Sequence, residues 1–548
     1  SIKMKQRFMF MNLRYTVIVV LAAGMVPWSY HPRGQQVLLV AASPLTRPKK
    51  KNPHILMIVV DDMGSHDLGI HGSGIKTPNA DALAYQGVYL DQYYVLPYCS
   101  PTRAALLSGK YPLHAGLHDV IPPNSTAGLP LREETLADLL KRAGYHTTNA
   151  IGKWHIGHSQ WEKTPTFRGF DEFYGFYHGG EDYFTHKHGG AHDLRHDRGP
   201  RCGKGCSQVV DQRGQYSTFL FANETIRMVK EYAASIANNN NSSMAAGPLF
   251  QYLAFQAVHC PTQVPPEYMT RYLNRTKWKK ERKIYAGMLT AVDVAIGQVI
   301  RTYQEANLWN DTLVVLTTDN GGPSTTGCVN GASNYPKRGG KCSLWEGGTT
   351  GDGFLSGPAL SGLGIRGGKR FRNLFHVVDW FPTIAEWIDV VPLHQDELDG
   401  KSQAQSLQQQ GAPPARTELF IGFVEVKDAK SLKHWFGPSL RHLHWKIVQG
   451  DSAGPDKLNP KPLGTLNPMP GGLANSTYLL FDLARDPSER VNVAATYPDI
   501  LQDMIYKLTL YQQTYVAQQT NDGSDCPFGG FVRDPVVGLT WEPWCDKV

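Results

Sequence analysis

The chain has 548 residues, of which 41% are hydrophobic and 19% are charged, a composition typical of folded globular proteins and not of disordered ones. Its length allows one large domain and a smaller second one. The formal net charge of +7 fits an anionic substrate, but over this length it is too small to indicate a nucleic-acid partner.

We expect residues 1–52 to be a signal peptide and a basic linker. Basic residues precede two apolar runs, 17–23 and 37–42. Both runs are shorter than the about 20 apolar residues that span a bilayer, so we expect no stable membrane span. A single uncleaved anchor is the alternative. Seven N-x-S/T triplets agree with the secretory pathway, leading to the lysosome or the cell exterior: Asn124, Asn223, Asn240, Asn241, Asn274, Asn310 and Asn475.

From residue 53 onward the chain alternates apolar runs with helical patterns. Residues 55–60 and 313–318 are continuous apolar runs, typical of strands that are covered on both faces. Runs 249–255 and 147–151 are weaker examples. Helical patterns lie between them, at residues 133–143 and 284–305. Residues 53–415 are therefore predicted to form an α/β domain with a mostly parallel sheet between helices.

The composition changes near residue 401. Residues 401–414 are rich in Gln, Ser, Ala and Pro, which indicates a surface loop near a domain boundary. Short alternating runs follow at 418–426, 444–448 and 478–483, and then an amphipathic stretch at 499–516. Residues 416–548 are predicted to form a smaller α+β domain with an antiparallel sheet and a terminal helix.

Polar residues follow the two strongest predicted strands. Asp61 and Asp62 follow the first run, and Asp319 and Asn320 follow the run from residue 313. In open α/β sheets ligands bind at the carboxyl ends of the strands. A lone Asp in such a place is more often a turn or cap residue, so the prediction depends on all of these residues converging. An all-oxygen set favours calcium or magnesium over zinc.

The two weaker runs also end near reactive side chains. His259 follows run 249–255, and Lys153 and His155 follow run 147–151. A lone His is more often an ordinary hydrogen-bonded residue than a catalytic one. The prediction of a functional site therefore depends again on all of these side chains meeting at one edge of the sheet. Lys153 and His155 are two residues apart, so on an extended strand they would face the same side.

A helix is predicted to begin near Pro101, because Pro favours the first helical turn and an apolar run follows it. The start of a helix attracts anions. Arg103 lies one helical turn after Cys99. An anionic group beside Cys99 would meet Arg103, Lys153 and Lys341.

Several segments resemble a known family. Residues 99–103, Cys-Ser-Pro-Thr-Arg, resemble the C-x-P-x-R signature of type I sulfatases, and residues 144–157 resemble the second sulfatase signature. Residues 339–348 look like the family's lysine-bearing loop, and 480–489 like its C-terminal strand and turn. The details are most similar to the arylsulfatase B, I and J group. The resemblance implies an alkaline-phosphatase-like α/β fold.

The resemblance also implies a mechanism for sulfate ester hydrolysis. A formylglycine-generating enzyme would oxidise Cys99 to an aldehyde, whose hydrate binds one calcium ion. One hydroxyl of this diol attacks sulfur and the other then expels sulfate. Substrates would be aryl sulfates in vitro and sulfated sugars or glycosaminoglycans naturally. The implied roles are calcium binding by Asp61, Asp62, Cys99, Asp319 and Asn320, charge compensation by Arg103, Lys153 and Lys341, protonation of the leaving alcohol by His259, and assistance to sulfate release by His155.

The remaining cysteines suggest disulfides. Three pairs are close in sequence, Cys202 with Cys206, Cys328 with Cys342, and Cys526 with Cys545, although spacing alone does not fix connectivity. With Cys99 converted, this scheme leaves Cys260 as a free, dispensable thiol.

Two other functions are alternatives. A phosphatase or phosphodiesterase of the same superfamily would usually use Thr or Ser and two metals. A matrix protein could bind sulfated polysaccharide without turnover. An aryl sulfate turnover assay, together with loss of turnover in Cys99→Ala, separates a sulfatase from such a matrix protein. The segment 177–198 is predicted to be a loop on the pocket wall, with a zinc site as the less favoured reading; its five histidines are His178, His186, His188, His192 and His196.

Overall fold

The computed structural model describes residues 51–238, 247–324, 328–427, 433–449, 478–517, 526 and 528–545, with only the backbone described at 423–427 and 433–436. Residues 52–548 form one compact unit. The predicted signal segment, and the sequons at Asn240, Asn241 and Asn475, lie outside the described residues.

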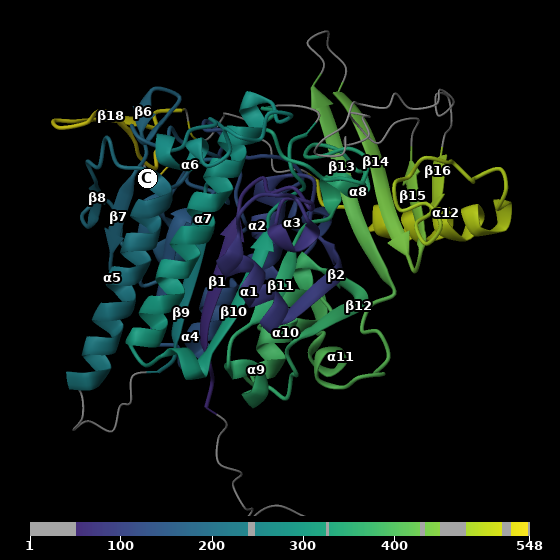
Figure 1. The fold of residues 1–548 in the computed structure, drawn as a ribbon, viewed down its shortest axis with the longest axis horizontal. Coiled ribbons are helices and arrows are strands. Elements are labelled where there is room, and N and C mark those ends of the chain that lie inside the picture. Colours follow the sequence, from purple (N-terminus) through teal and green to yellow (C-terminus); the bar gives the residue numbers. More distant parts are fainter. Residues whose placement is uncertain are drawn as a thin grey trace, which may run out of the picture. The chain divides into compact units, whose positions relative to one another are not determined.

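A ten-stranded mixed sheet is the centre of the fold (Figure 1). Its strand order is β12-β2-β11-β10-β1-β9-β3-β4-β7-β8. The strands are β1 (His54–Val60), β2 (Val88–Tyr94), β3 (Thr147–Lys153), β4 (Glu172–Phe176), β7 (Arg195–Arg198), β8 (Ser207–Val209), β9 (Leu249–Phe255), β10 (Thr312–Thr318), β11 (Gly353–Ser356) and β12 (Lys369–His376).

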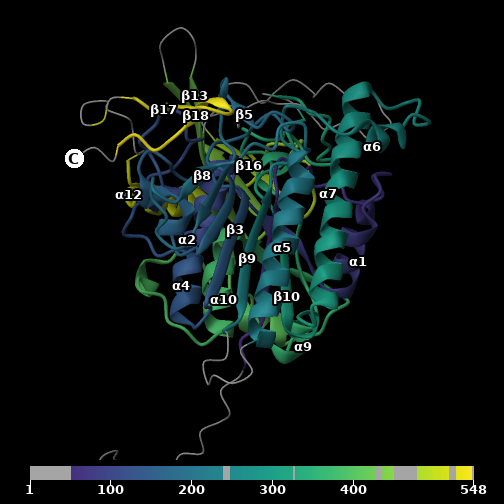
Figure 2. The ribbon, with the colours of Figure 1, turned by 90° about the vertical axis from the view of Figure 1, so that its left-hand side faces the viewer.

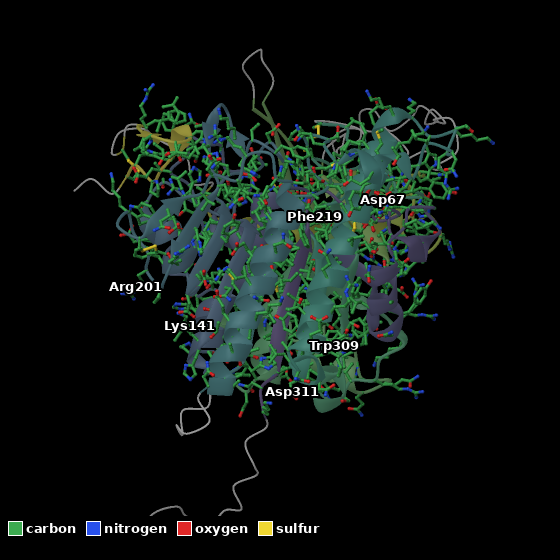
Figure 3. The ribbon with its side chains drawn as sticks, turned by 60° about the vertical axis from the view of Figure 1, so that its left-hand side comes forward. Asp67, Lys141, Arg201, Phe219, Trp309 and Asp311 are labelled. Carbon is green, nitrogen blue, oxygen red and sulfur yellow. A yellow bond between two sulfur atoms is a disulfide. The ribbon has the colours of Figure 1, made fainter. Side chains whose placement is uncertain are left out.

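The five central strands, β10, β1, β9, β3 and β4, are all parallel, as predicted. Val60, the last residue of β1, lies beside Phe255 of β9 and Thr318 of β10. The segments after these strands therefore leave the sheet at one edge. Figure 3 shows this polarity: Asp67, after β1, lies at one end of the sheet, while Trp309 and Asp311, before β10, lie at the other.

Helices cover both faces of the sheet. Ile55 and Met57 of β1 pack into one apolar cluster with α2, α4 and α10, whereas Leu56 and Ile58 pack into the other with α1, α5 and α7 (Figure 2). Burial on both faces explains the unbroken apolar run. The helices are α1 (Pro78–Gln86), α2 (Cys99–Ser108), α3 (Pro112–Ala115), α4 (Leu136–Arg142), α5 (Ser217–Asn238), α6 (Pro266–Thr270), α7 (Lys280–Glu305), α8 (Glu346–Thr349), α9 (Ala359–Gly362), α10 (Trp380–Trp387) and α11 (Ala404–Gln408).

Helix α7 is the one helix of the described residues that is long and apolar enough to cross a membrane. However, 72% of its most apolar window is buried inside the fold. It packs against α5 and α1 and contributes to the apolar cluster under the sheet. Its apolar character is therefore that of a core helix.

After the central sheet the chain forms a second, antiparallel sheet and a helix, as predicted, although a further hairpin follows the helix. The sheet has the order β13-β14-β15-β16, and helix α12 (Pro498–Gln513) packs against β14 and β15. The boundary near residue 415 stays a prediction. The strands are β13 (Glu418–Lys427), β14 (Lys433–His442), β15 (Trp445–Gln449) and β16 (Tyr478–Asp482).

The last strands return to the first part of the chain. β17 (Phe531–Asp534) and β18 (Gly538–Trp541) form a hairpin, and β18 pairs with β6 (Ala191–His192), which pairs with β5 (Lys187–His188). Figure 1 shows β18 beside β6 and far from α12. No local pattern in the sequence predicts this return.

The predicted disulfide scheme is partly wrong. Cys202–Cys206 and Cys526–Cys545 are bonded as predicted, but Cys328 is bonded to Cys260 and not to Cys342. Cys260 is therefore not a free thiol, and Cys342 is unbonded. The fold brings together two loops that lie 68 residues apart, which spacing along the chain does not reveal.

Candidate active site

The side chains that follow the central strands meet at one edge of the sheet. Asp61 lies directly after β1 and is fully buried. Its Oδ2 atom accepts a hydrogen bond from Lys153 Nζ at 2.6 Å, and Arg103 lies 3.6 Å from the same oxygen. Burial acts to raise the pKa of Asp61, but Lys153 and His259 outweigh it, so the pKa falls below its ordinary value. Asp61 is therefore a carboxylate.

Asp62 lies beside Asp61, in a left-handed backbone conformation with φ of 59°. Its Oδ1 accepts hydrogen bonds from Lys341 Nζ at 2.5 Å and from Asn320 Nδ2 at 2.7 Å. Burial acts to raise its pKa, but Lys341 outweighs burial and the pKa is lowered. The strained turn and these contacts direct a second carboxylate to the same place.

Asp319 is held by Arg103. The Arg103 guanidinium donates to Asp319 Oδ2 from Nε at 3.1 Å and from the second terminal nitrogen at 2.8 Å, and both side chains are buried. The backbone N–H of Asp62 donates to Asp319 Oδ1 at 3.2 Å. Burial and the neighbouring Asp61 nevertheless raise the pKa of Asp319, which indicates a surplus of carboxylates in this cluster.

The donor set fits a hard cation. Asp61 Oδ1 and Asn320 Oδ1 are buried acceptors with no hydrogen-bond donor among the described residues. Ligand atoms of Asp61, Asp62 and His259 lie within 4.8 Å of one another. Buried oxygens without donors are the atoms that a bound ion satisfies. We conclude that Asp61 and Asp62, with His259 beside them, form a place that fits a metal ion.

Cys99 begins helix α2 and is 2% exposed. The helix begins two residues before Pro101, with Tyr98 at its N-cap. Cys99 Sγ lies 3.3 Å from His155 Nδ1, and burial raises the pKa of the thiol. The predicted nucleophile position therefore lies at the start of a helix, against an imidazole.

His155 reaches Cys99 in another way than predicted. Strand β3 ends at Lys153, and His155 lies beyond it with φ of 58°, so the alternation of an extended strand does not place it. Its Nε2 lies 3.2 Å from the carbonyl oxygen of Ile121. Burial, together with Lys153, holds its pKa well below the ordinary value, so the ring is neutral.

His259 lies at the mouth of the site. Its Nε2 is 3.8 Å from Asp62 Oδ2, its Nδ1 is 2.6 Å from the Cys260 carbonyl oxygen, and its side chain is 24% exposed. Burial and then Lys341 lower its pKa. Tyr183, which the sequence analysis missed, donates its hydroxyl to the His259 carbonyl oxygen at 2.8 Å.

A pocket of about 490 Å³ opens onto this cluster. Its lining includes Cys99, His155, His259 and Lys341. One part of the walls, residues 120–123, was not predicted, because it has no periodic pattern, whereas residues 179–182 and 187–189 belong to the segment 177–198 that was predicted to form the pocket wall. These walls are residues 120–123, 179–182, 187–189 and 260–261.

The histidine-rich segment contributes to the pocket wall, as predicted. His188 lines the pocket and its ring stacks on His178, with centroids 4.8 Å apart. His178 Nδ1 lies 2.7 Å from Asp193, and His186 Nδ1 lies 3.1 Å from Glu181. Within the described ranges no group of potential metal ligands includes these histidines, so the zinc alternative is not favoured.

Comparison with known proteins identifies the class. The sulfatase family model matches residues 53–390. Mouse arylsulfatase J is 32% identical over 90% of this chain and 80% of its own length, and human arylsulfatase A is 27% identical over 94% and 97%. A crystal structure of Ps i-CgsB is 28% identical, with a TM-score of 0.69 over 86% of this chain and 96% of that one.

The family model covers most of the chain, and the similarity to arylsulfatase J extends over 90% of this chain. The fold of these relatives is the alkaline-phosphatase-like α/β fold that the sequence predicted. The chain therefore belongs to the sulfatase family, as a sulfuric ester hydrolase of type I that is similar to arylsulfatase J.

Proposed function

We propose that this sulfatase hydrolyses sulfate esters with a formylglycine made from Cys99 and with one bound calcium ion. The observation that carries the proposal is the position of Cys99: it begins a helix at the floor of the pocket, among the side chains that follow β1, β3 and β10. Asp61, Asp62, Asp319 and Asn320 would hold the ion. The hydrate of the aldehyde made from Cys99 would supply the nucleophile for the sulfate ester, and the ion, when bound, would lower the pKa of the attacking hydroxyl.

The cationic side chains have two tasks in this proposal. Arg103 fixes Asp319 through two hydrogen bonds, so that carboxylate keeps one orientation toward the ion. Lys153 and Lys341 contact Asp61 and Asp62 and also stand beside Cys99, where they would offset negative charge on the sulfuryl oxygens.

The two histidines divide the proton transfers. His259 lies at the pocket mouth, where the alcohol of the substrate would leave, and is assigned the role of proton donor to that alcohol. His155 contacts Cys99 and is neutral, so it can accept a proton from the group at position 99 when sulfate is released.

The finer assignments follow from the family and from the pocket. A formylglycine-generating enzyme would be the maturation partner, and the signal segment would direct the chain to the lysosome or the cell exterior. Ps i-CgsB has been crystallised with k-i-k-neocarrahexaose, an oligosaccharide. We assign sulfated sugars, including glycosaminoglycans, as natural substrates and aryl sulfates as substrates in vitro.

A turnover assay tests this function. Protein from a eukaryotic secretory host should hydrolyse an aryl sulfate, and the tryptic peptide with residue 99 should carry the aldehyde by mass spectrometry. Cys99→Ala should abolish turnover, while Cys342→Ala, which changes the other unbonded cysteine, should retain it. Full activity in a preparation that contains only unmodified Cys99 would contradict the proposal.

A further inference from the structure

Two short segments complete the pocket wall beyond the catalytic groups. Residues 179–182 and 187–189 line the same space of about 490 Å³ as Cys99 and His259. This volume is within the range of small-molecule sites. A substrate therefore has room to place a group beyond the reacting sulfate against these segments.

The C-terminal strand holds this wall in place. Trp541 of β18 donates its indole N–H to the His188 carbonyl oxygen at 2.8 Å, and its ring lies 4.1 Å from that of His178. β18 also pairs with β6, the partner of β5, and the Cys526–Cys545 disulfide closes the segment. A disulfide-closed hairpin from the end of the chain thus supports the pocket wall.

The two wall segments are also tied to each other. His188 Nδ1 donates to the Gly180 carbonyl oxygen, and the Asp182 backbone N–H donates to the Lys187 carbonyl oxygen at 2.9 Å. A wall fixed by such bonds before a ligand arrives loses little freedom on binding. It is suited to select among ligands.

The carboxylates on this wall are each engaged by neighbouring groups other than Lys187. Asp182 accepts from the backbone N–H groups of Phe184 and Thr185 and from Gln263 Nε2, so its oxygens are already occupied. Glu181 is buried against His186, and burial raises the pKa of Glu181 to about 7.

Two lysines also line the pocket. Lys341 pairs with Asp62. Lys187, at the exposed rim, has no ion pair with any side chain in the part of the chain that the structure describes. It is the cation that remains available on this wall.

We propose that Lys187 binds a second anionic group, a carboxylate or a further sulfate, on the sugar that carries or adjoins the reacting sulfate ester. Trp541 is a positioning residue that holds the Lys187–His188 strand against the pocket. This inference rests on the proposed function and narrows its substrate class to sulfated sugars with a second negative charge.

Matched substrates test the role of Lys187. One pair is a sulfated uronate disaccharide and its methyl ester; the other is a disulfated sugar and its monosulfated counterpart. In Lys187→Met, the ratio of kcat/KM for the charged over the less charged member should fall roughly three- to fivefold, mainly through KM. Lys187→Arg should keep most of the ratio. Lys230→Met, which changes an exposed lysine on α5, is the matched control.

The outcomes are distinct. A loss in the uronate arm or in the disulfated arm supports the proposal and identifies the anion, and the KM of Lys187→Met should depend less on ionic strength. An unchanged ratio in both arms would overturn it. Absence of aryl sulfate turnover by the wild-type protein would instead refute the proposed function.

The positioning role of Trp541 has its own readout. Trp541→Ala should lower the same ratio as Lys187→Met, because it releases the His188 carbonyl. Trp541→Phe keeps a ring but loses the N–H donor, and should give an intermediate ratio; it also serves if the alanine variant does not fold. Equal losses on the charged and the less charged member of each substrate pair in Trp541→Phe would reject the positioning role.

Discussion

The Cys260–Cys328 disulfide connects two loops that carry active-site groups. Cys260 directly follows His259, and Cys328 lies in the segment between Asn320 and Lys341. Removing the bond with the double change Cys260→Ser and Cys328→Ser frees a loop of 68 residues in the unfolded chain. The chain-entropy relation gives a loss of about 4 kcal/mol of stability for a loop of this length.

The stability losses expected for the other two disulfides provide a comparison within the same protein. The same relation gives about 2 kcal/mol for Cys202–Cys206, with a separation of 4, and about 3 kcal/mol for Cys526–Cys545, with a separation of 19. Denaturant unfolding of the three double-serine variants should therefore rank them in the order of their loop lengths.

Measurements of kcat separate an effect of the Cys260–Cys328 bond on the position of His259 from its effect on the stability of the fold. The Cys260 carbonyl oxygen contacts His259 Nδ1, so loss of the bond should let His259 move and should lower kcat on sugar sulfates at temperatures where the variant stays folded. The Cys202–Cys206 variant, far from this contact, should keep kcat. Full kcat in the Cys260/Cys328 variant, or a stability loss no larger than that of the Cys202/Cys206 variant, would refute the reasoning.

Three further changes test other parts of the site. Asp319→Ala should remove calcium and activity together in metal analysis and turnover assays; stoichiometric zinc in the wild-type protein would contradict the oxygen-ligand assignment. His259→Ala should slow sugar sulfates more than activated aryl sulfates, because a general acid contributes about 10²–10⁴ in rate mainly to poor leaving groups; equal losses would reject its role. Burial raises the pKa of Glu181 from 4.5 to about 7, so the unfolded chain releases this proton first and stability should fall as pH rises between these values, by up to about 3 kcal/mol. Glu181→Gln should reduce that fall in Tm measurements at pH 5 and pH 8, and an unchanged fall would exclude Glu181 as its source.

The central strands were predictable because they are buried on both faces. The runs that became β1, β9 and β10 differ from their predictions by at most one residue. β4 was not predicted because it contains Gly175, and glycine is unfavourable inside a strand. A Cβ there would lie 2.0 Å from the Gly152 carbonyl oxygen on β3, so the close approach of the two strands requires glycine.

Other elements could not be predicted because they are stabilised by contacts with residues far away in the sequence. β2 contains tyrosines and polar residues, which do not indicate a buried strand. Its Tyr93 is nevertheless buried, and the hydroxyl has a hydrogen-bond partner there, Thr317 Oγ1 at 2.7 Å. The residues after the strands could be identified, since the polarity of a parallel sheet brings them to one edge. The pairing of β18 with β6 and the bond between Cys260 and Cys328 depend on distant segments meeting, for which the local sequence contains no signal.

A buried ion cluster connects the smaller sheet to the loop that carries Lys341. Lys446 of β15 is fully buried, 3.0 Å from Glu346 and 2.7 Å from Glu489. The backbone N–H of Glu346 donates to Glu489 Oε2 at 2.7 Å, and Arg338 donates to the Glu489 carbonyl oxygen at 2.7 Å.

Buried charges of this kind add little net stability while paired, but breaking one costs about 3–5 kcal/mol, so they restrict the chain to one arrangement. The arrangement restricted here is the loop from Arg338 to Glu346, which carries Lys341. The region that the sulfatase family model matches ends at residue 390, before Lys446 and Glu489. Residues 53–390 alone would leave Glu346 without its ion pair to Lys446, and the loop that presents Lys341 to Asp62 would lose this contact with the smaller sheet.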